Sequence, residues 1–156
     1  MHALVLNCTL KPSPARSNTD QLAEVVVDGL QREKVNVERI RLVAQRMLER
    51  MDAMLSETDA AGRPVAYNRV AGVVVTGNED GAHHVISEIS GALCDIGYTI
   101  PGQSWTYWNK GPGPGPSYTE TAEGHEWSAK TGRAMASNLA AEARALADNP
   151  IPAPSG

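Results

Sequence analysis

Two polar segments, each placed after an apolar run, carry the residue types best suited to chemistry. The first ends in Ser17, Asn18 and Thr19, just before residues with helical spacing. The second is Thr76-Gly77-Asn78-Glu79-Asp80-Gly81. Both are rich in hydrogen-bonding groups, but no nucleophile paired with a base can be recognised in either. The pattern favours ligand binding over covalent catalysis by a side chain.

The first segment is suited to an anion. Free backbone N–H groups and the positive end of the dipole at the start of a helix attract negative charge. The hydroxyl groups of Ser17 and Thr19 and the amide of Asn18 would complete a cradle for a phosphate monoester. The alternative is that these three side chains only cap the helix.

The second segment is suited to a flat ligand. Gly77 and Gly81 allow the backbone to approach a ring closely, because glycine has no side chain and permits a positive φ. Backbone amides would then contact polar atoms at the ring edge. The alternative is an ordinary turn from strand to helix with Asp80 as the N-cap.

The hydrophobic pattern predicts alternating strands and helices. Apolar or β-branched runs predict strands at 3–6, 35–42, 70–75 and 98–100, with a register change inside the second. Helical spacing predicts helices at 22–30, 43–55, 85–96 and 126–147. This order indicates an α/β fold, an open parallel sheet with helices on both faces, over residues 1–148, followed by a proline-rich tail at 149–156. Ligands of such folds bind beyond the carboxyl ends of the strands, where both polar segments lie.

Composition excludes several classes of protein. The 156 residues suit one domain, and no apolar run reaches the roughly 18 residues that a membrane span needs. Lys and Arg number 14 against 18 for Asp and Glu, a net charge of −4 that disfavours general nucleic-acid binding. With only Cys8 and Cys94, and an N-terminus that opens directly into an apolar strand, we expect a cytoplasmic protein without disulfides.

Three further groups of residues have alternative interpretations. Trp105, Tyr107 and Trp108 would form a stacking wall for a ligand, or else an oligomer interface or a small separate core. His83 and His84 are adjacent, so they cannot bind one metal ion as a pair spaced i, i+4 could. We therefore expect surface or loop-contact histidines and no metal site. The Gly-Pro repeat at 111–116 indicates a stiff, extended loop.

Taken together, the segments 9–19 and 73–81 resemble the flavodoxin-like family of NAD(P)H-dependent FMN reductases and multimeric flavodoxin-type oxidoreductases. The resemblance implies that FMN is bound, with NADH or NADPH as reductant, and that electrons pass to a quinone, a free flavin or a similar small acceptor. It implies homodimers or homotetramers and no catalytic side chain. The implied cofactor-binding residues are Thr9, Ser17, Asn18 and Thr19 for the phosphate, and Thr76, Gly77, Asn78, Asp80 and Gly81 for the ribityl chain and the ring.

Two other functions stay open. One alternative is a flavodoxin-type electron carrier or flavin-binding module without nicotinamide activity. Such carriers usually present a strongly acidic face, whereas this chain is only mildly acidic and has no acidic run. The other alternative is a phosphate-binding domain that has lost the ability to bind flavin. No G-x-G-x-x-G follows the first strand and no G-x-x-x-x-G-K-[ST] occurs, so neither phosphate motif supports a dinucleotide site.

The family pattern is incomplete between Leu42 and Val43. A third strand and its ligand-contacting loop are expected there, yet a strand end meets a helical pattern with no turn or cap residue between them. We predict either that roughly 20–40 residues, about the length of part of a βαβ unit, are omitted from this sequence, or that a true deletion has removed half of the flavin pocket.

Overall fold

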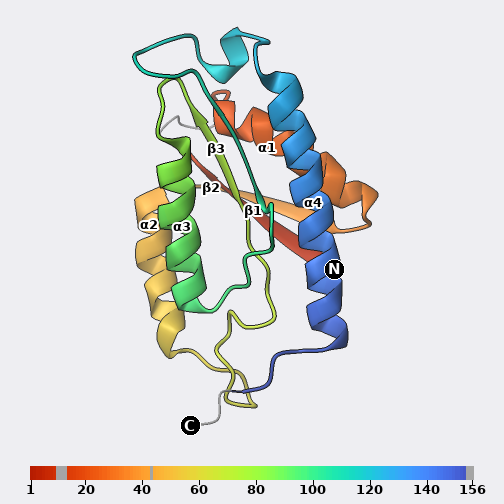
Figure 1. Cartoon of the computed structure of the whole chain (residues 1–156). Coiled ribbons are helices and arrows are strands. Elements are labelled where there is room, and N and C mark those ends of the chain that lie inside the picture. The colour runs from red at the N-terminus through yellow and green to blue at the C-terminus, as the bar shows by residue number, and fades with distance from the viewer. Residues whose placement is uncertain (10–13, 43, 154–156) are drawn as a thin grey trace.

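The computed structural model describes residues 1–9, 14–42 and 44–153. Strands and helices alternate along the chain (Figure 1). The elements are β1 (His2–Cys8), α1 (Asn18–Arg32), β2 (Asn36–Leu42), α2 (Ala44–Met51), η1 (Asp52–Ser56), β3 (Val73–Gly77), α3 (Ala82–Ile96), β4 (Trp105–Asn109), η2 (Tyr118–Glu120) and α4 (His125–Asp148), where η marks a 3₁₀ helix.

The strands form two separate parallel sheets. β1 pairs with β2, and β3 pairs with β4. The first pairing runs without a break from His2 opposite Asn36 to Cys8 opposite Leu42. The register change predicted inside the second strand is therefore wrong, because every residue of β2 has its own partner in β1.

The prediction of a flavodoxin-like open sheet is wrong. Strand order joins β1 only to β2 and β3 only to β4, which gives two two-stranded sheets in place of one continuous sheet. Between β2 and β3 the described residues form α2, η1 and irregular chain, so they supply no strand that could pair with both β1 and β3. The apolar runs marked individual strands, but only pairing partners decide whether strands join. The predicted omission or deletion falls at Val43, which lies outside the described residues.

The helices lie on both sides of the strands. Figure 1 shows α1 and α4 on one side and α2 and α3 on the other. α1 and α4 pack against each other, and their buried apolar residues form the main core. This core contacts Ala3 and Val37 of the first sheet as well as Val74 of the second. The same pair of helices therefore holds the two sheets in place.

The strand predicted at residues 98–100 is also wrong. Thr99 makes only an isolated bridge with Val70, and the strand forms instead at Trp105–Asn109. Pro101 cannot donate a backbone hydrogen bond, and Gln103 has a positive φ of 52°, so extended structure is interrupted before residue 105. The aromatic and threonine residues that follow favour a strand.

No helix within the described ranges is long and apolar enough to span a membrane. Cys8 and Cys94 are both free thiols. Burial raises the pKa of the Cys8 thiol.

The tail after α4 is attached to an earlier loop, since the backbone N–H of Ile151 donates to the Asn68 side chain at 2.6 Å.

Candidate functional site

The two polar segments meet at one end of the molecule. Figure 1 shows the carboxyl ends of β1 and β3 at the end of the molecule where α1, α3 and α4 begin. Gly77, the last residue of β3, lies opposite Asn109, the last residue of β4. This end therefore gathers the start of three helices with the carboxyl ends of three strands.

Ser17 caps the first helix. Its hydroxyl oxygen accepts a hydrogen bond from the backbone N–H of Asp20 at 3.3 Å, and its hydroxyl group donates to the Asn7 side chain at 3.5 Å. Ser17 and Asn7 are both buried, being 4% and 5% exposed. Ser17 thus has the capping role of the alternative interpretation, which fixes the direction in which the free N–H groups of α1 point.

Thr19 joins the two predicted segments. Its hydroxyl oxygen lies 2.7 Å from that of Thr76, so a hydrogen bond connects the first turn of α1 to β3. The structure therefore brings together one residue predicted to bind the phosphate, Thr19, and one predicted to line the rest of the flavin, Thr76. Each threonine is half-buried.

Asn18 faces a segment that the sequence did not identify. Its side-chain oxygen accepts hydrogen bonds from the backbone N–H of Thr119 at 3.2 Å and from the Thr119 hydroxyl at 2.8 Å. The side-chain N–H₂ of Asn18 is the group left to donate to a ligand. Thr119 belongs to η2, which packs on α1 through Leu22 and Tyr118. η2 therefore borders the start of α1.

The other predicted residues lie around this centre. Thr9 follows β1 directly and is half-buried, while Gly77 ends β3. Asn78, Asp80 and Gly81 are exposed. Gly81, not Asp80, is the N-cap of α3, with a φ of 100° that favours glycine. The Asp80 cap of the alternative interpretation is thus wrong, and α3 begins without a side-chain cap.

Sequence reasoning missed Arg41, which contacts the first segment directly. Its Nη1 donates to the backbone oxygen of Ala15 at 2.9 Å, and its Nη2 lies 3.6 Å from Oδ2 of Asp20. Arg39, two residues earlier on β2, forms a two-point ion pair with Glu24 at 2.6 and 2.7 Å. Hydrogen bonding to Arg39 lowers the pKa of Glu24 below its usual value. Both arginines lie on the face of β2 that is turned towards α1.

The signals for the missed residues differ. Asn7 ends the first apolar run, and its polarity at that position was a usable sign. Arg41 has the spacing i, i+2 from Arg39 that places both on one face of a strand. Thr119 gave no local signal, because it lies 101 residues from its partner Asn18.

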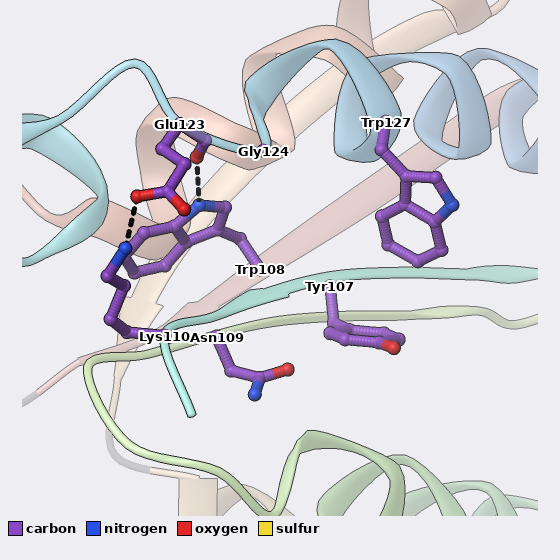
Figure 2. Close-up of a pocket in the computed structure, with 7 residues that line it drawn as sticks. All are labelled: Tyr107, Trp108, Asn109, Lys110, Glu123, Gly124 and Trp127. Carbon is purple, nitrogen blue, oxygen red and sulfur yellow. Dashed lines mark hydrogen bonds and ion pairs between the residues drawn. The ribbon is translucent and has the colours of Figure 1, made fainter. Parts of the chain in front are cut away.

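A cavity of about 220 Å³ lies beside this end, between β4 and the start of α4. In Figure 2 Trp127 points towards Tyr107, and Lys110 reaches Glu123. Lys110 and Glu123 form an ion pair, while the indole N–H of Trp108 donates to the backbone oxygen of Glu123 at 2.7 Å. The lining residues are Tyr107, Trp108, Asn109, Lys110, Glu123, Gly124 and Trp127.

The three clustered aromatic residues do not form one wall. Trp105 and Tyr107 contact His83, with ring centroids 5.5 and 4.8 Å away. Trp108 is buried instead against Leu22 and Tyr118. This split follows from strand geometry, since neighbouring side chains point to opposite faces. In the described residues no group of three or more His, Cys, Asp or Glu is arranged to hold a metal ion.

Comparison with known proteins finds two similar proteins whose names refer to flavin phosphates. The chain is 26% identical to an 8-demethyl-8-aminoriboflavin-5'-phosphate synthase of Streptomyces davaonensis over 205 residues, covering 96% of this chain and 80% of the synthase. It superposes on the crystal structure of RosB with a bound intermediate, 8-demethyl-8-formylriboflavin-5'-phosphate, with a TM-score of 0.89 and 26% identity over 97% of this chain and 82% of RosB. No protein-family model matches the chain.

A second relative matches this chain over only a quarter of the relative's own length. The chain is 28% identical over 173 residues to a divalent metal cation transporter, MntH, of Mycobacterium bovis, covering 80% of this chain and 25% of the transporter. The alignment with the synthase spans 205 residues, more than the 156 present here. The synthase therefore has residues between the matched segments that have no counterpart in this chain.

These comparisons correct the functional predictions. The assignment to NAD(P)H-dependent FMN reductases is wrong, because the relative and the structural neighbour are a flavin-phosphate synthase and RosB. The predicted NAD(P)H-to-acceptor activity, FMN as cofactor and NADH or NADPH as reductant fall with it. The error has a physical cause: residue types suited to a phosphate are the same whether a bound flavin is a cofactor or a compound to be transformed.

Proposed function

We propose that this protein binds a riboflavin-5'-phosphate compound as its substrate and acts on the flavin ring. The observation that carries the proposal is the superposition on RosB, whose structure holds 8-demethyl-8-formylriboflavin-5'-phosphate. The synthase with which the chain aligns over 96% of its length is named for a compound of the same class. The hydrogen bond between Thr19 and Thr76 supports the proposal from this chain itself.

The phosphate would bind at the start of α1. The side-chain N–H₂ of Asn18 and the hydroxyl group of Thr19 would donate to phosphate oxygens, together with free backbone N–H groups of the first turn. Ser17 would contribute through the cap that orients this turn. Thr9, at the end of β1, would border the phosphate from the other side of the loop.

The ribityl chain and the ring would bind against the end of β3. Thr76 and Gly77 would line the ribityl chain, and the exposed residues Asn78, Asp80 and Gly81 would contact the ring edge. Polar groups at a ring edge set the orientation of a flavin, while backbone approach at glycine gives the flat ring room. In this proposal the protein holds and orients the reacting flavin.

The test is a binding titration followed by product analysis. Purified protein is titrated with riboflavin-5'-phosphate and with 8-demethyl-8-formylriboflavin-5'-phosphate, the compound bound in RosB, while flavin fluorescence is recorded. We expect saturable binding of at least one of them and, on incubation in air with an amino-group donor, a mass change of the flavin by liquid chromatography and mass spectrometry. Binding of inorganic phosphate without any flavin would overturn the proposal and favour the phosphate-binding alternative.

Assembly and location are proposed on separate grounds. We propose a homodimer or homotetramer, supported by the exposed side chain of Trp127, which contacts Tyr107 with a ring-centroid distance of 4.9 Å. Light scattering on the purified protein gives the mass that tests it.

We also propose a cytoplasmic location, supported by the two free thiols. Residues 1–148 are proposed as the binding domain and 149–156 as its tail.

A further inference from the structure

We propose that Arg41 positions the phosphate-binding loop and supplies the positive charge that a flavin phosphate needs there. The inference rests on the proposed function, since it concerns the phosphate of the same ligand. Arg41 lies on β2, outside both polar segments, and its guanidinium donates a hydrogen bond to the backbone oxygen of Ala15, in the described part of the loop before α1. In this role Arg41 holds the loop residues in position and also contributes its positive charge.

The strand places Arg41 where it can act. Arg39 and Arg41 are two residues apart on β2, so both side chains project from the same face. Arg39 pairs closely with Glu24, one turn further along α1, and lies 4.0 Å from Asp20. Arg41 reaches Ala15 and Asp20, at 2.9 and 3.6 Å. β2 thus carries one arginine to the middle of α1 and the other to its start.

The contacts of Arg41 hold two separate parts of the cradle. Ala15 precedes the N-cap Ser17, and Asp20 lies in the first turn of α1. One planar guanidinium contacts a backbone oxygen before the cap and a carboxylate after it, at 2.9 and 3.6 Å. A lysine has a single ammonium group and cannot present the same rigid fork.

Charge balance shows why a cation is needed here. Ser17, Asn18 and Thr19 are neutral and the neighbouring Arg16 is exposed, whereas a phosphate monoester carries a charge of about −1.5 to −2 at pH 7. Asp20 adds a negative charge in the same turn, which would repel the phosphate. The Arg41 guanidinium, a quarter exposed, faces Asp20 and offsets its charge. Removing Arg41 would leave Asp20 opposed only by the more distant Arg39, whose Nη1 lies 4.0 Å from Oδ1 of Asp20.

The experiment separates phosphate recognition from binding of the rest of the flavin. Dissociation constants for riboflavin-5'-phosphate and for riboflavin are measured on the full chain, and their ratio reports the phosphate contribution. We expect Arg41→Gln to weaken binding of the phosphate ester about tenfold and leave riboflavin unchanged, the scale of one charge-assisted contact. Asp20→Asn should shift the ratio the opposite way, by a few-fold. Arg41→Lys should restore part of the loss.

Arg39→Gln is the matched control. It removes the same charge from the same strand face. Arg39 pairs mainly with Glu24, lies 4.0 Å from Asp20, and makes no hydrogen bond to the described loop residues 14–17, so the ratio should stay within about twofold of the unchanged protein. Equal ratios for Arg41→Gln and Arg39→Gln, or equal loss of both ligands in Arg41→Gln, would overturn the inference while the proposed function stands. A ratio near one in the unchanged protein would count against the proposed phosphate site itself.

Discussion

The hydroxyl oxygens of Thr19 and Thr76 lie 2.7 Å apart, although 57 residues separate them in the sequence. One belongs to the first turn of α1 and the other to β3, so the contact joins a helix start to a strand end. No contact of this kind is visible in either polar segment by itself. It joins the two segments directly in the folded protein.

We predict energetic coupling between these threonines. Thr19→Val and Thr76→Val should each reduce the free energy of unfolding, and the double variant should lose less than the sum by about 0.5–1.5 kcal/mol, the net value of one hydrogen bond. Valine keeps the shape of threonine, so the cycle isolates the hydroxyl groups. Urea unfolding of the four proteins gives the coupling, and strictly additive losses would show that the contact contributes nothing.

Local structure could be predicted from the sequence to a large extent. The helix predicted at 22–30 is confirmed by α1, and that at 126–147 by α4. The apolar runs at 3–6 and 70–75 likewise overlap β1 and β3. These predictions succeed because helical spacing and continuous apolar runs are properties of a short stretch of chain.

Pairing and distant contacts could not be predicted in the same way. Whether β1 joins β3 depends on a strand between them, and none is present in the part of the chain that the structure describes. Arg41 and Thr119 reach the candidate site through tertiary packing, so their own neighbours in the sequence give no indication of it. The sequence thus located both polar segments, but not the residues that hold them.

Ser17 offers a test of capping against ligand contact. Ser17→Ala should lower the free energy of unfolding by about 0.5–2 kcal/mol, whereas Ser17→Gly should cost only a few tenths, because glycine is tolerated at an N-cap. Both variants remove the same hydroxyl group. If that hydroxyl touched the ligand, both would weaken riboflavin-5'-phosphate binding equally, so a loss that follows stability instead identifies the cap.

Acid should weaken the Glu24–Arg39 pair. The pKa of Glu24 is lowered in the folded protein, so the pair stabilises the fold above the ordinary glutamate pKa, and this contribution is lost as the pH falls through the lowered value. The Glu24 side chain is half exposed, which limits the effect to about 0.5 kcal/mol. Unfolding free energies at neutral and acid pH should therefore differ less in Glu24→Gln than in the unchanged protein.

Arg39→Gln removes the partner of Glu24 and leaves the carboxylate in place. It should reduce the difference in unfolding free energy between neutral and acid pH by the same amount as Glu24→Gln. This follows because hydrogen bonding to Arg39 is the main cause of the lowered pKa of Glu24. Acid dependence that is identical in all three proteins would contradict the assignment.

Gly29 should reverse the usual effect of replacing a helical glycine by alanine. Alanine normally stabilises a helix interior by about 1 kcal/mol relative to glycine. At Gly29 of α1, however, an added Cβ would lie 2.6 Å from the Cβ of the buried Ala136 on α4, closer than two carbon atoms can approach. Gly29→Ala should therefore destabilise the protein by about 1–3 kcal/mol, the cost of overpacking a core contact.

Gly91 of α3 is the matched control, because nothing lies within 4 Å of an added Cβ there. Gly91→Ala should raise the free energy of unfolding by about 0.5–1 kcal/mol through helix propensity alone. Adding Ala136→Gly to Gly29→Ala should recover part of the loss, since it removes the atom that clashes. Urea unfolding of these variants tests the close approach of α1 and α4, the two helices that hold both sheets, and a Gly29→Ala variant as stable as the unchanged protein would exclude it.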